Sequence, residues 1–550
     1  MSSKIDGVLE TVGALGKYQW IQTSFAGYAY FAGALQFLAI VFHGITPNHR
    51  CSLPDWPEDT YQVINERHNE SIHQWIPMKN GELDTCHIYT SNHTNQTREC
   101  TQYVFDSMEY WGTSLNMQFG MLCSTAYIGT TVKVIFTVGQ IAGAVVVGVI
   151  SDRFGRKTAL VGSVMVGSVV GIVTSFSVNI YMFAALRFII AACYTGAVLA
   201  AHIITMEVVG PSHRTYAIAF RSLFWPGGTM FLSLFAYYLQ DWNYLQLATS
   251  IPGLIGGIAM IFFVKETPHF LVTKGQHEEA ERLFSSIAKM NGKTLPHDLI
   301  EQLKEDEESA ATEKLSEIIH APVLLKRFAV FLYLWFVAGL GFYGLGFNVT
   351  NLLGNVYINN LIAGSAELAT VPMTLLSKKL GRKALVIGSL FIGGASLLAS
   401  TFMGMHLDSN KYGSLMILVY MIGKAGIACV FLFDYFWSSE VFPTTLRSSL
   451  VGLCSLLARI GSILAPIIAD LSNQVDTIFG SNLGVLIFGI TMVIGGFLAF
   501  LLPETNNYRM PETIAEANVF RTGRDAYSST DNKKIGEFSS EANLFASSQL

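Results

Sequence analysis

Three ionisable residues lie inside long apolar stretches of the sequence, where a charge is costly to keep. Arg459 has no acidic residue within one helical turn, and Glu367 and Lys424 lie in two other apolar stretches. If these stretches cross a bilayer, a central charge costs roughly 2.5–3.5 kcal/mol on insertion scales and must be compensated. A guanidinium offers a two-pronged fork of donors to a carboxylate or a sulfate. Arg459 is therefore a candidate ligand for an anionic group, with Glu367 and Lys424 as further candidate binding residues.

Each of these residues also has a purely structural interpretation. Arg459 would then form a salt bridge with Glu367 or Asp434 across a cavity. Glu367 would serve packing alone, and Lys424 would belong to a structural ion pair. The sequence leaves these alternatives open.

Two other arginines, Arg187 and Arg221, lie nearer to the ends of predicted helices. There a long side chain can carry its charge to the polar boundary of the membrane. This snorkelling is enough to explain both residues, so we predict no binding role for either.

Aromatic side chains would supply the broad contact area that a site for varied organic molecules needs. Trp335 and Phe342 are seven residues apart and share one helical face, so a flat ring or a quaternary ammonium could stack between them. Aromatic residues of membrane helices are more often lipid-facing or part of the core, and this alternative applies to each candidate. The candidates are Trp225, Trp335, Phe342, Tyr343, Phe431 and Tyr435.

The composition indicates a membrane protein. Of the 550 residues, 51% are hydrophobic and only 14% are charged, and the mean hydropathy is +0.41. These values are too apolar for a typical soluble protein. The net charge of −5 comes without basic blocks, so we predict no nucleic-acid partner. The sequence contains no phosphate-binding glycine loop, nucleophile elbow or metal-ligand cluster, so we predict no enzyme, no metal site and no cofactor.

Twelve apolar stretches are long enough to cross a ~30 Å hydrocarbon core at ~1.5 Å per residue. The first lacks an evident cleavage site, so we predict no cleavable signal peptide. An even number of spans puts both termini on one side, and basic side chains gather in the short loops of that side, so we predict cytoplasmic termini. The predicted spans are 22–43, 131–150, 158–177, 180–206, 215–239, 244–264, 327–349, 353–376, 384–404, 412–436, 446–470 and 481–502.

Residues 44–130 are predicted to form a large extracellular loop. Its cysteines and glycosylation sequons fit an oxidising compartment. Four cysteines permit three pairings and the sequence does not choose among them; free thiols in an unstructured loop are the alternative. The loop histidines lack the close spacing of zinc ligands. The residues concerned are Cys51, Cys86, Cys100 and Cys123, and Asn69, Asn92 and Asn95.

The remaining segments complete the predicted organisation. Residues 1–21 form a cytoplasmic N-terminus, and 265–326 a cytoplasmic loop with amphipathic helices. Residues 503–550 form a cytoplasmic tail whose polar composition predicts disorder. Residues 131–264 hold the second to sixth membrane helices, and 327–502 hold the seventh to twelfth.

The sequence repeats itself at a separation of roughly 230 residues. Ordered matches at a nearly constant separation predict two six-helix bundles that arose by duplication. Parallel repeats of this kind place the substrate path near the bilayer midplane, between the halves. The matches are Gly155-Arg156-Lys157 with Gly381-Arg382-Lys383, the pair Glu207 and Arg214 with the pair Glu440 and Arg447, and Glu266-Thr267 with Glu504-Thr505.

The stretch 148–157, GVISDRFGRK, fits G-x-x-x-D-R-x-G-R-K. It resembles the loop between the second and third membrane helices of the major facilitator superfamily. Further stretches resemble the organic cation, organic anion and carnitine transporters of solute carrier family 22, and the likeness runs from about residue 6 to residue 516. These stretches are MEVVGPSHR at 206–214, DW and LQL within 241–247, FYGL at 342–345, NLLG at 351–354, SEVFPT at 439–444 and LPET at 502–505.

The resemblance implies the major facilitator fold, two pseudo-symmetric six-helix bundles, and transport by alternating access in the plasma membrane. It implies that, when the cytoplasmic side is shut, Asp152 lies near a helix N-terminus of the other half, while Arg156 pairs with Glu207 and Arg382 with Glu440. The alternative is that these charges only fix the topology. The full set of predicted gating residues is Gly148, Asp152, Arg153, Gly155, Arg156, Glu207, Arg214, Arg382, Glu440 and Arg447.

Some residues depart from the family pattern. Lys378 stands where an acid would complete the second motif and Thr374 where a glycine would stand, so we predict two unequal cytoplasmic latches. Asp434 occupies a position that is usually aliphatic.

The family resemblance also bears on the substrate. Anion and carnitine transporters resemble this sequence in having arginine at the position of Arg459, whereas typical cation carriers have aspartate there; Glu367 occupies the family's acidic position. We therefore expect a small organic anion or a carnitine-like zwitterion as the substrate, within a lipid bilayer and with an undetermined coupling ion or counter-substrate. The alternatives are an organic cation transporter, a receptor-like member that does not transport, and a sugar porter.

Overall fold

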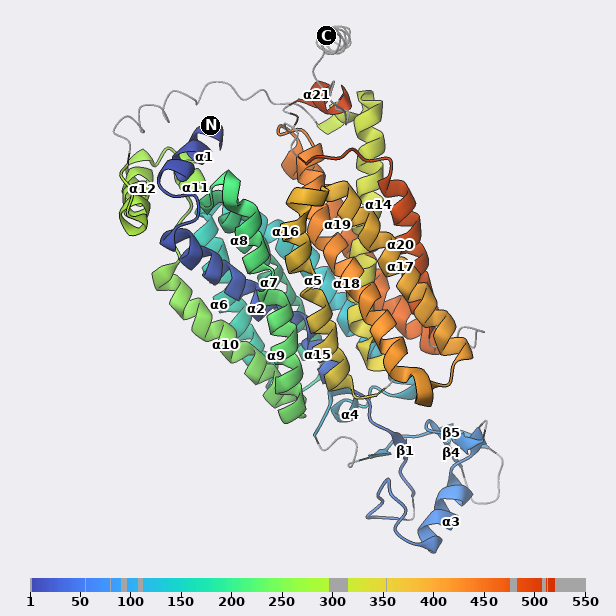
Figure 1. Ribbon diagram of the computed structural model, residues 1–550. Helices are drawn as coiled ribbons and strands as arrows, with labels where there is room; N and C mark the ends of the chain where they lie inside the picture. Colours follow the sequence, from blue (N-terminus) through green and yellow to red (C-terminus); the bar gives the residue numbers. More distant parts are fainter. Residues whose placement is uncertain are drawn as a thin grey trace, which may run out of the picture.

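Two bundles of helices lie side by side and make up most of the molecule (Figure 1). The structure is a computed structural model that describes residues 2–54, 56–79, 81–90, 96–106, 112–295, 315–352, 354–474, 482–506, 511 and 513–519. The first bundle comprises α2 (Lys17–His43), α5 (Tyr127–Phe154), α6 (Arg156–Thr174), α7 (Ile180–Val208), α8 (Arg214–Arg221), α9 (Phe224–Tyr238) and α10 (Trp242–Phe263). The second comprises α14 (Pro322–Phe347), α15 (Val356–Glu367), α16 (Thr370–Leu380), α17 (Arg382–His406), α18 (Ser409–Val441), α19 (Arg447–Gln474) and α20 (Leu483–Ala499).

Nine helices of the described residues are long and apolar enough to cross a membrane. The other three predicted spans contain shorter helices. The span at 215–239 consists of α8 and α9, the span at 353–376 corresponds to α15 and α16, and the last contains α20, of 17 residues.

The two interrupted spans share a sequence cause. Pro226 follows the break after α8, and Pro372 follows the break after α15. A proline has no amide hydrogen to donate to the carbonyl four residues earlier, and its ring clashes with that carbonyl. The carbonyls of Ser222 and Leu368 therefore lose their helical donors at the breaks.

Close packing of small residues holds neighbouring helices together within each half. A Cβ atom placed on Gly143 of α5 would lie 2.1 Å from the carbonyl oxygen of Ala192 on α7. A Cβ on Gly339 of α14 would lie 2.0 Å from the carbonyl oxygen of Ala458 on α19. Small residues allow this approach because membrane helices associate by contact rather than by exclusion from water.

The two halves meet chiefly where α5 packs on α19, α9 on α15, and α8 on α16, and α2 also contacts α14. Near the end of the bundle that carries the segment between α2 and α5, the rings of Phe42 on α2 and Tyr357 on α15 stack with their centroids 5.6 Å apart. Asn360 on α15 also donates to the carbonyl of Thr229 on α9 at 3.2 Å and to the hydroxyl of Ser233 at 2.8 Å.

A small domain stands at one end of the bundle, which we call the α3 end. It contains α3 (Glu66–Trp75), α4 (Leu115–Gln118), the one-turn helix η1 (Cys123–Thr125) and three antiparallel pairs of short strands. The pairs are β1 (His49–Cys51) with β6 (Tyr103–Phe105), β2 (Met78–Lys79) with β3 (Glu82–Leu83), and β4 (His87–Tyr89) with β5 (Thr97–Glu99). The cysteines pair as Cys51–Cys100 and Cys86–Cys123.

This small domain has its own core and one buried ion pair. Asp59 lies 2.5 Å from Arg50 and 2.9 Å from His68. Burial opposes ionisation of Asp59, but the hydrogen bonds from Arg50, the Leu53 amide and His68 outweigh it and lower the pKa of Asp59. Asn69 is exposed on α3. The other two predicted glycosylation sites, Asn92 and Asn95, lie outside the described residues.

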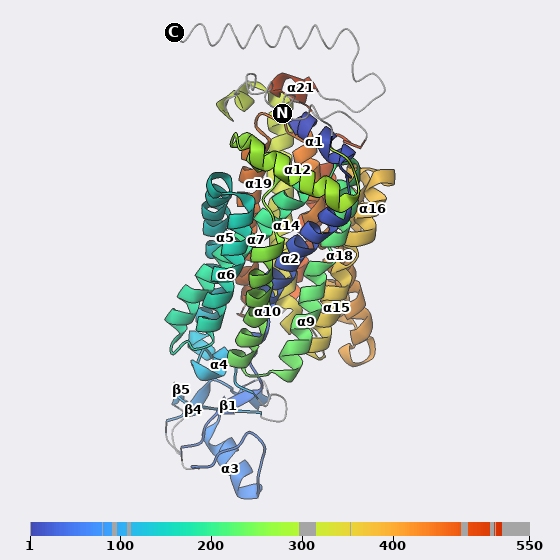
Figure 2. The same ribbon diagram turned by 90° about the vertical axis from the view of Figure 1, so that its left-hand side faces the viewer.

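Short helices cover the opposite end, which we call the α12 end (Figure 2). They are α1 (Ser2–Thr11), α11 (Pro268–Thr273), α12 (His277–Asn291), η3 (Leu315–His320) and α21 (Ile514–Val519). The first of them, α1, was not predicted from the sequence. Asp6 of α1 pairs with Arg214 at 2.5 Å, and the side-chain amide of Asn291 donates to the carbonyl of Val12 at 3.1 Å.

Candidate functional site

A narrow cavity of about 140 Å³ lies between the two halves. Both halves contribute polar and aromatic side chains to its wall. Those from the first half include Tyr30, Phe37, Thr195, His202, Arg221 and Trp225, and those from the second include Phe342, Tyr343, Glu367, Phe431, Tyr435 and Arg459.

Arg459 reaches this cavity from α19, and no described carboxylate forms a salt bridge with it. Its Nη1 donates to the Gln140 side-chain oxygen at 2.9 Å and to the Tyr343 hydroxyl at 3.0 Å. The side chain is buried, and Nε has no partner among the described residues. The salt bridge to Glu367 or Asp434 that the sequence left open is absent from the described part of the chain. Arg459 is therefore a buried cation whose assigned partners are neutral.

Glu367 and Lys424 form an ion pair with each other. The Lys424 ammonium lies 3.2 Å from Oε1 of Glu367, and both side chains are 2% exposed. This is the structural pair considered for Lys424, and it balances the charge of Glu367 in the cavity wall. Lys424 also lies 5.9 Å from the ring centroid of Phe342.

The prediction that Arg187 and Arg221 snorkel to the membrane boundary is wrong. Arg221 is 2% exposed and lines the cavity, while Arg187 is fully buried. Arg221 donates to the Tyr30 hydroxyl at 2.7 Å, and Arg187 donates to the carbonyl of Gln36 at 2.9 Å. Arg221 is the last residue of α8, so it lies at the break within the predicted span 215–239 and lines the cavity there.

The aromatic candidates divide into cavity residues and core. Phe342 and Phe431 stack with their centroids 5.2 Å apart, and Trp225 and Tyr435 also line the cavity. Trp335 is 1% exposed and packs edge-on against Tyr435 at 4.4 Å. Trp335 is therefore not a partner with which Phe342 could sandwich a ligand.

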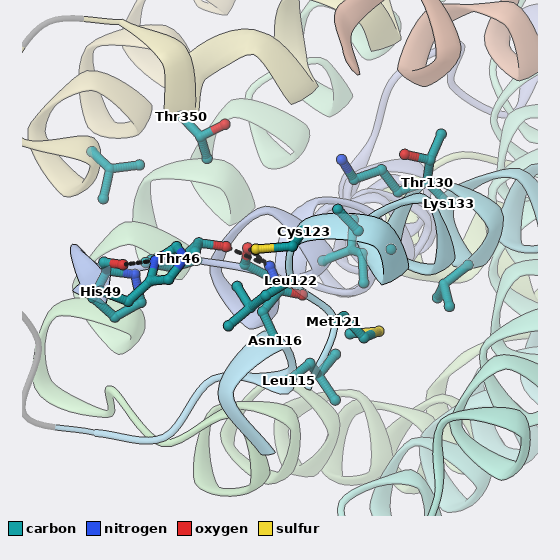
Figure 3. Close-up of a pocket in the computed structure, with 18 of the residues that line it drawn as sticks. Thr46, His49, Leu115, Asn116, Met121, Leu122, Cys123, Thr130, Lys133 and Thr350 are labelled. Atoms are coloured by element: carbon teal, nitrogen blue, oxygen red, sulfur yellow. Dashed lines mark hydrogen bonds between the residues drawn. The ribbon is translucent and has the colours of Figure 1, made fainter. Parts of the chain in front are cut away.

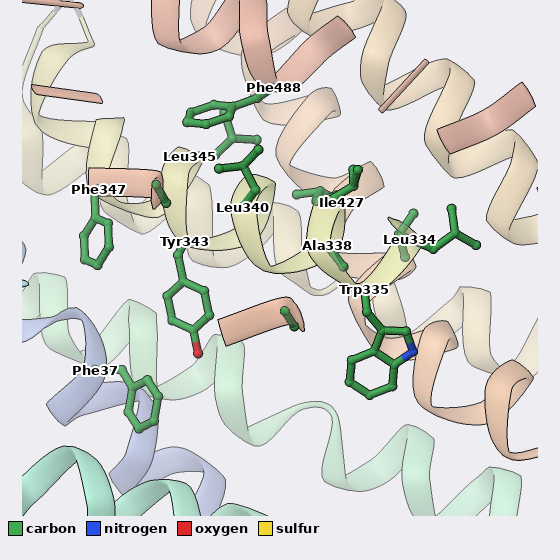
Figure 4. Packing of buried hydrophobic residues seen from close by; sticks show 14 of the residues in the cluster. Phe37, Leu334, Trp335, Ala338, Leu340, Tyr343, Leu345, Phe347, Ile427 and Phe488 are labelled. Atoms are coloured by element: carbon green, nitrogen blue, oxygen red, sulfur yellow. The ribbon is translucent and has the colours of Figure 1, made fainter. Parts of the chain in front are cut away.

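One face of α14 carries both cavity-facing and core residues (Figure 4). Tyr343 and Trp335 point from one side of the helix, and Leu340 and Leu345 point from the other toward Phe488. Helical periodicity correctly groups Trp335 with the cavity side. The periodicity does not show that the ring of Tyr435 packs against the Trp335 indole and separates it from the cavity.

Sequence reasoning missed Gln140, His202 and Tyr30 at this site. Gln140 on α5 accepts from Arg459 across the interface between the halves. The ring of His202 on α7 lies 5.8 Å from that of Tyr435 on α18. An amide or an imidazole inside an apolar span was the available signal, because such groups need partners in a membrane.

Two matching networks brace the α12 end, one inside each half. In the first, Glu207 contacts Arg156 at 3.3 Å and accepts from the Thr267 hydroxyl at 2.5 Å. In the second, Glu440 contacts Arg382 at 3.1 Å and accepts from the Thr505 hydroxyl at 2.5 Å. The sequence repeat therefore extends to the contacts.

Glu266 and Glu504, rather than the predicted Asp152, lie at the N-termini of α6 and α17. Glu266 accepts from the backbone amides of Arg156 and Lys157, the first residues of α6. Glu504 accepts in the same way from the first amides of α17. Asp152, predicted to lie near a helix N-terminus of the other half, is 76% exposed and pairs with Arg156 at 3.3 Å. The first amides of a helix have no acceptor within the helix, and a carboxylate there accepts their hydrogen bonds and interacts favourably with the positive end of the helix dipole. Glu266 and Glu504 do this here.

Lys378 of α16 makes contacts that cross between the halves at this end. Its ammonium donates to the carbonyl of Ser212 at 3.3 Å and lies 4.2 Å from the ring centroid of Tyr216. Lys378 was not among the predicted gating residues. Two of the predicted gating cations, Arg153 and Arg447, contact residues of their own half. Arg153 is exposed beside the Phe154 ring, and Arg447 donates to the carbonyl of Phe442 at 3.5 Å.

The two motif glycines are expected to respond very differently to alanine. Gly155 has φ +104°, and an added Cβ would lie 2.2 Å from the Glu266 carboxylate. Gly148 has no atom within 4 Å of the position of an added Cβ, so a methyl group fits there without a clash. Gly155→Ala should lower the free energy of unfolding by more than about 1 kcal/mol and reduce uptake. Gly148→Ala is the matched control and should leave both near wild type; thermal unfolding of the purified proteins distinguishes them.

The buried carboxyl group of Asp434 is expected to lower the free energy of unfolding. It is fully buried on α18 and does not line the cavity, and both carboxylate oxygens lack a hydrogen-bond partner among the described residues. An unsatisfied buried acceptor costs roughly 1–3 kcal/mol. Asp434→Leu should therefore raise the unfolding temperature, and Asp434→Asn should raise it less. A lower unfolding temperature for Asp434→Leu would show that the carboxylate has a partner.

A second, larger pocket of about 650 Å³ lies at the α3 end (Figure 3). Its wall joins the small domain to both halves, with His49 and Cys123 from the domain, Lys133 from α5 and Thr350 from the second half. Asn116 fixes the rim by donating to the carbonyl of Gly44 at 2.9 Å and the hydroxyl of Thr46 at 2.7 Å. The small domain thus stands over one approach to the helices.

Comparison with known proteins agrees with this architecture. The model of the family described as "Sugar (and other) transporter" matches residues 81–515. The chain is 29% identical over 538 residues to an organic cation transporter protein of Drosophila melanogaster, covering 94% of each chain. It is 27% identical over 562 residues to solute carrier family 22 member 13 of Homo sapiens, covering 98% of each chain.

Among solved structures, the partially occluded inward-open xylose transporter XylE from E. coli has a TM-score of 0.61 and 16% identity. The match covers 90% of this chain and 100% of that chain. This likeness concerns the fold, and it confirms the predicted helical membrane architecture of the major facilitator type. The chain therefore belongs to the sugar (and other) transporter family of the major facilitator superfamily, and it is a multi-pass membrane transporter related to solute carrier family 22.

Proposed function

We propose that this transporter carries small organic anions. The observation that carries the proposal is Arg459, a buried guanidinium in the cavity wall whose assigned partners are the neutral Gln140 and Tyr343. A buried cation without a counter-charge favours an anionic ligand, because the ligand supplies the missing charge. The carboxylate of Glu367 does not act as the counter-charge of Arg459, since it is paired with Lys424.

Transport would proceed by rocking of the two halves about the cavity. Phe342, Phe431, Trp225 and Tyr435 would hold the apolar part of the substrate. The networks around Glu207 and Glu440 would keep each half rigid. Lys378 would close the α12 end through contacts that a small movement can break.

We further propose that the α12 end faces the cytoplasm and that the protein works in the plasma membrane. Basic side chains gather at this end, among them Arg153, Lys157 and Lys379. The two disulfides and the exposed sequon at Asn69 suit an oxidising exterior at the α3 end.

A carnitine-like zwitterion is the second candidate, because Glu367 lines the same cavity as Arg459. A quaternary ammonium could approach the Phe342 and Phe431 rings while the carboxylate meets Arg459. This arrangement would place the cationic group beside Lys424, which disfavours it relative to a simple anion.

Uptake of charge-matched compounds tests the proposal. Cells expressing the protein should accumulate radiolabelled benzoate above control cells, and more of it than carnitine or tetraethylammonium. Preferential uptake of tetraethylammonium or of a neutral sugar would overturn the anion assignment. Binding of benzoate without uptake would identify a receptor-like member of the family.

A further inference from the structure

A second buried cation enters the cavity from the opposite half. Arg221 ends α8 in the first half, whereas Arg459 belongs to α19 in the second, and both line the same cavity of about 140 Å³. Arg221 is 2% exposed. Two guanidinium groups therefore share one small, largely apolar space.

The surroundings of Arg221 carry no compensating charge. Its Nη1 donates to the Tyr30 hydroxyl at 2.7 Å, and its Cζ lies 4.4 Å from the centroid of the same ring. Its Nε is buried and without a partner among the described residues. No described carboxylate lies within 4 Å of its guanidinium, so Arg221 repeats the electrostatic condition of Arg459.

The other cavity residues do not neutralise this pair of cations. Glu367 supplies the carboxylate of the wall, and it is already paired with Lys424. The imidazole ring of His202 lies tilted against the ring of Tyr435 across the halves, with the centroids 5.8 Å apart, and it brings no negative charge. The lining thus keeps an excess of positive charge in a low-dielectric space, where like charges repel strongly.

We propose that Arg221, with Tyr30, forms a second anion subsite, and that the cavity selects small substrates carrying two anionic groups. One group binds Arg459 in the second half and the other binds Arg221 in the first; the inference rests on the proposed role of Arg459 as an anion ligand. Such a dianion cancels both charges and holds both halves at once. A monoanion leaves one guanidinium uncompensated, so its complex is weaker and its closed state less populated.

The first test varies the substrate and needs no variant. Succinate and monomethyl succinate share a carbon chain but differ by one negative charge at neutral pH. Losing one charge-assisted hydrogen-bonded contact corresponds to roughly 10- to 100-fold in affinity. Wild-type protein should therefore take up succinate with a KM at least about tenfold below that of the monoester. Equal KM values for the two compounds would overturn the proposal.

The second test identifies the residue. Arg221→Met keeps the length of the side chain but removes its charge, and it should raise the KM for succinate to about that of the monoester, with a much smaller effect on the KM for the monoester. Arg221→Lys should restore part of the difference. Arg282→Met removes an arginine that is 78% exposed on α12 and should leave the ratio at the wild-type value. Equal losses for both compounds in Arg221→Met would indicate a structural role and contradict the subsite.

Different results would contradict the proposed transport of organic anions and the proposed second subsite at Arg221. If Arg459→Gln leaves uptake of both succinate and its monoester unchanged, the proposed function fails. If Arg459→Gln reduces both, while Arg221→Met leaves their KM ratio at the wild-type value, anion binding stands and the second subsite is wrong.

Discussion

Arg459→Asp is expected to reduce organic-anion uptake by at least about 100-fold, because it replaces the attractive charge of the cavity with a repulsive one. Loss of the guanidinium removes the donors now directed at Gln140 and Tyr343. The new carboxylate would also offset the positive charge of Arg221, which lines the same cavity. Initial uptake of radiolabelled benzoate, normalised to protein at the cell surface, measures the effect.

Two further variants at this position separate charge from shape. Arg459→Lys keeps the charge but not the planar fork and should retain weak uptake. Arg459→Gln loses the charge but can still hydrogen-bond and should lie between Arg459→Lys and Arg459→Asp. Wild-type uptake by Arg459→Asp at normal surface abundance would contradict the assigned role.

Lys424→Met is expected to lower the free energy of unfolding by about 3–5 kcal/mol. The substitution leaves Glu367 charged and unpaired where both partners are 2% exposed. Such a charge in a low-dielectric interior has little water to replace its lost partner. Thermal unfolding of purified protein in detergent, together with surface abundance in cells, measures the loss.

The double variant Lys424→Met with Glu367→Gln is the decisive control for this ion pair. It removes both charges, so stability should return to near the wild-type value although the pair is gone. Glu367→Gln alone should be nearly as damaging as Lys424→Met, because it leaves the ammonium unpaired. A double variant no more stable than either single variant would show that the pair is not the source of the loss.

The sequence predicted the parts of the site that depend on composition and local spacing. Arg459 stands out as a charge in an apolar stretch, and the repeat identifies Arg156 and Arg382 as equivalent residues. The matching ion pairs, Arg156 with Glu207 and Arg382 with Glu440, could be expected because duplicated segments fold alike. The same reasoning misplaced Arg221, since its role depends on where α8 ends.

Other features depend on contacts between distant segments. Asp152 and Glu266 are both acids near the start of α6, and nothing local to either shows which one reaches the helix amides. Trp335 has the same helical periodicity as Phe342, and only the packing of α18 shows that Tyr435 covers it. The pairing of the four cysteines likewise depends on how the strands of the small domain meet.

Gln140 links the candidate site to the interface between the halves. It belongs to α5 of the first half, yet it accepts from Arg459 of the second at 2.9 Å. If Arg459 binds the substrate as proposed, a substrate carboxylate would compete with this amide oxygen for the Arg459 donors. Substrate binding would then weaken the contact of α5 with α19, so the hydrogen bond that holds the halves together in the empty protein would be broken when substrate binds.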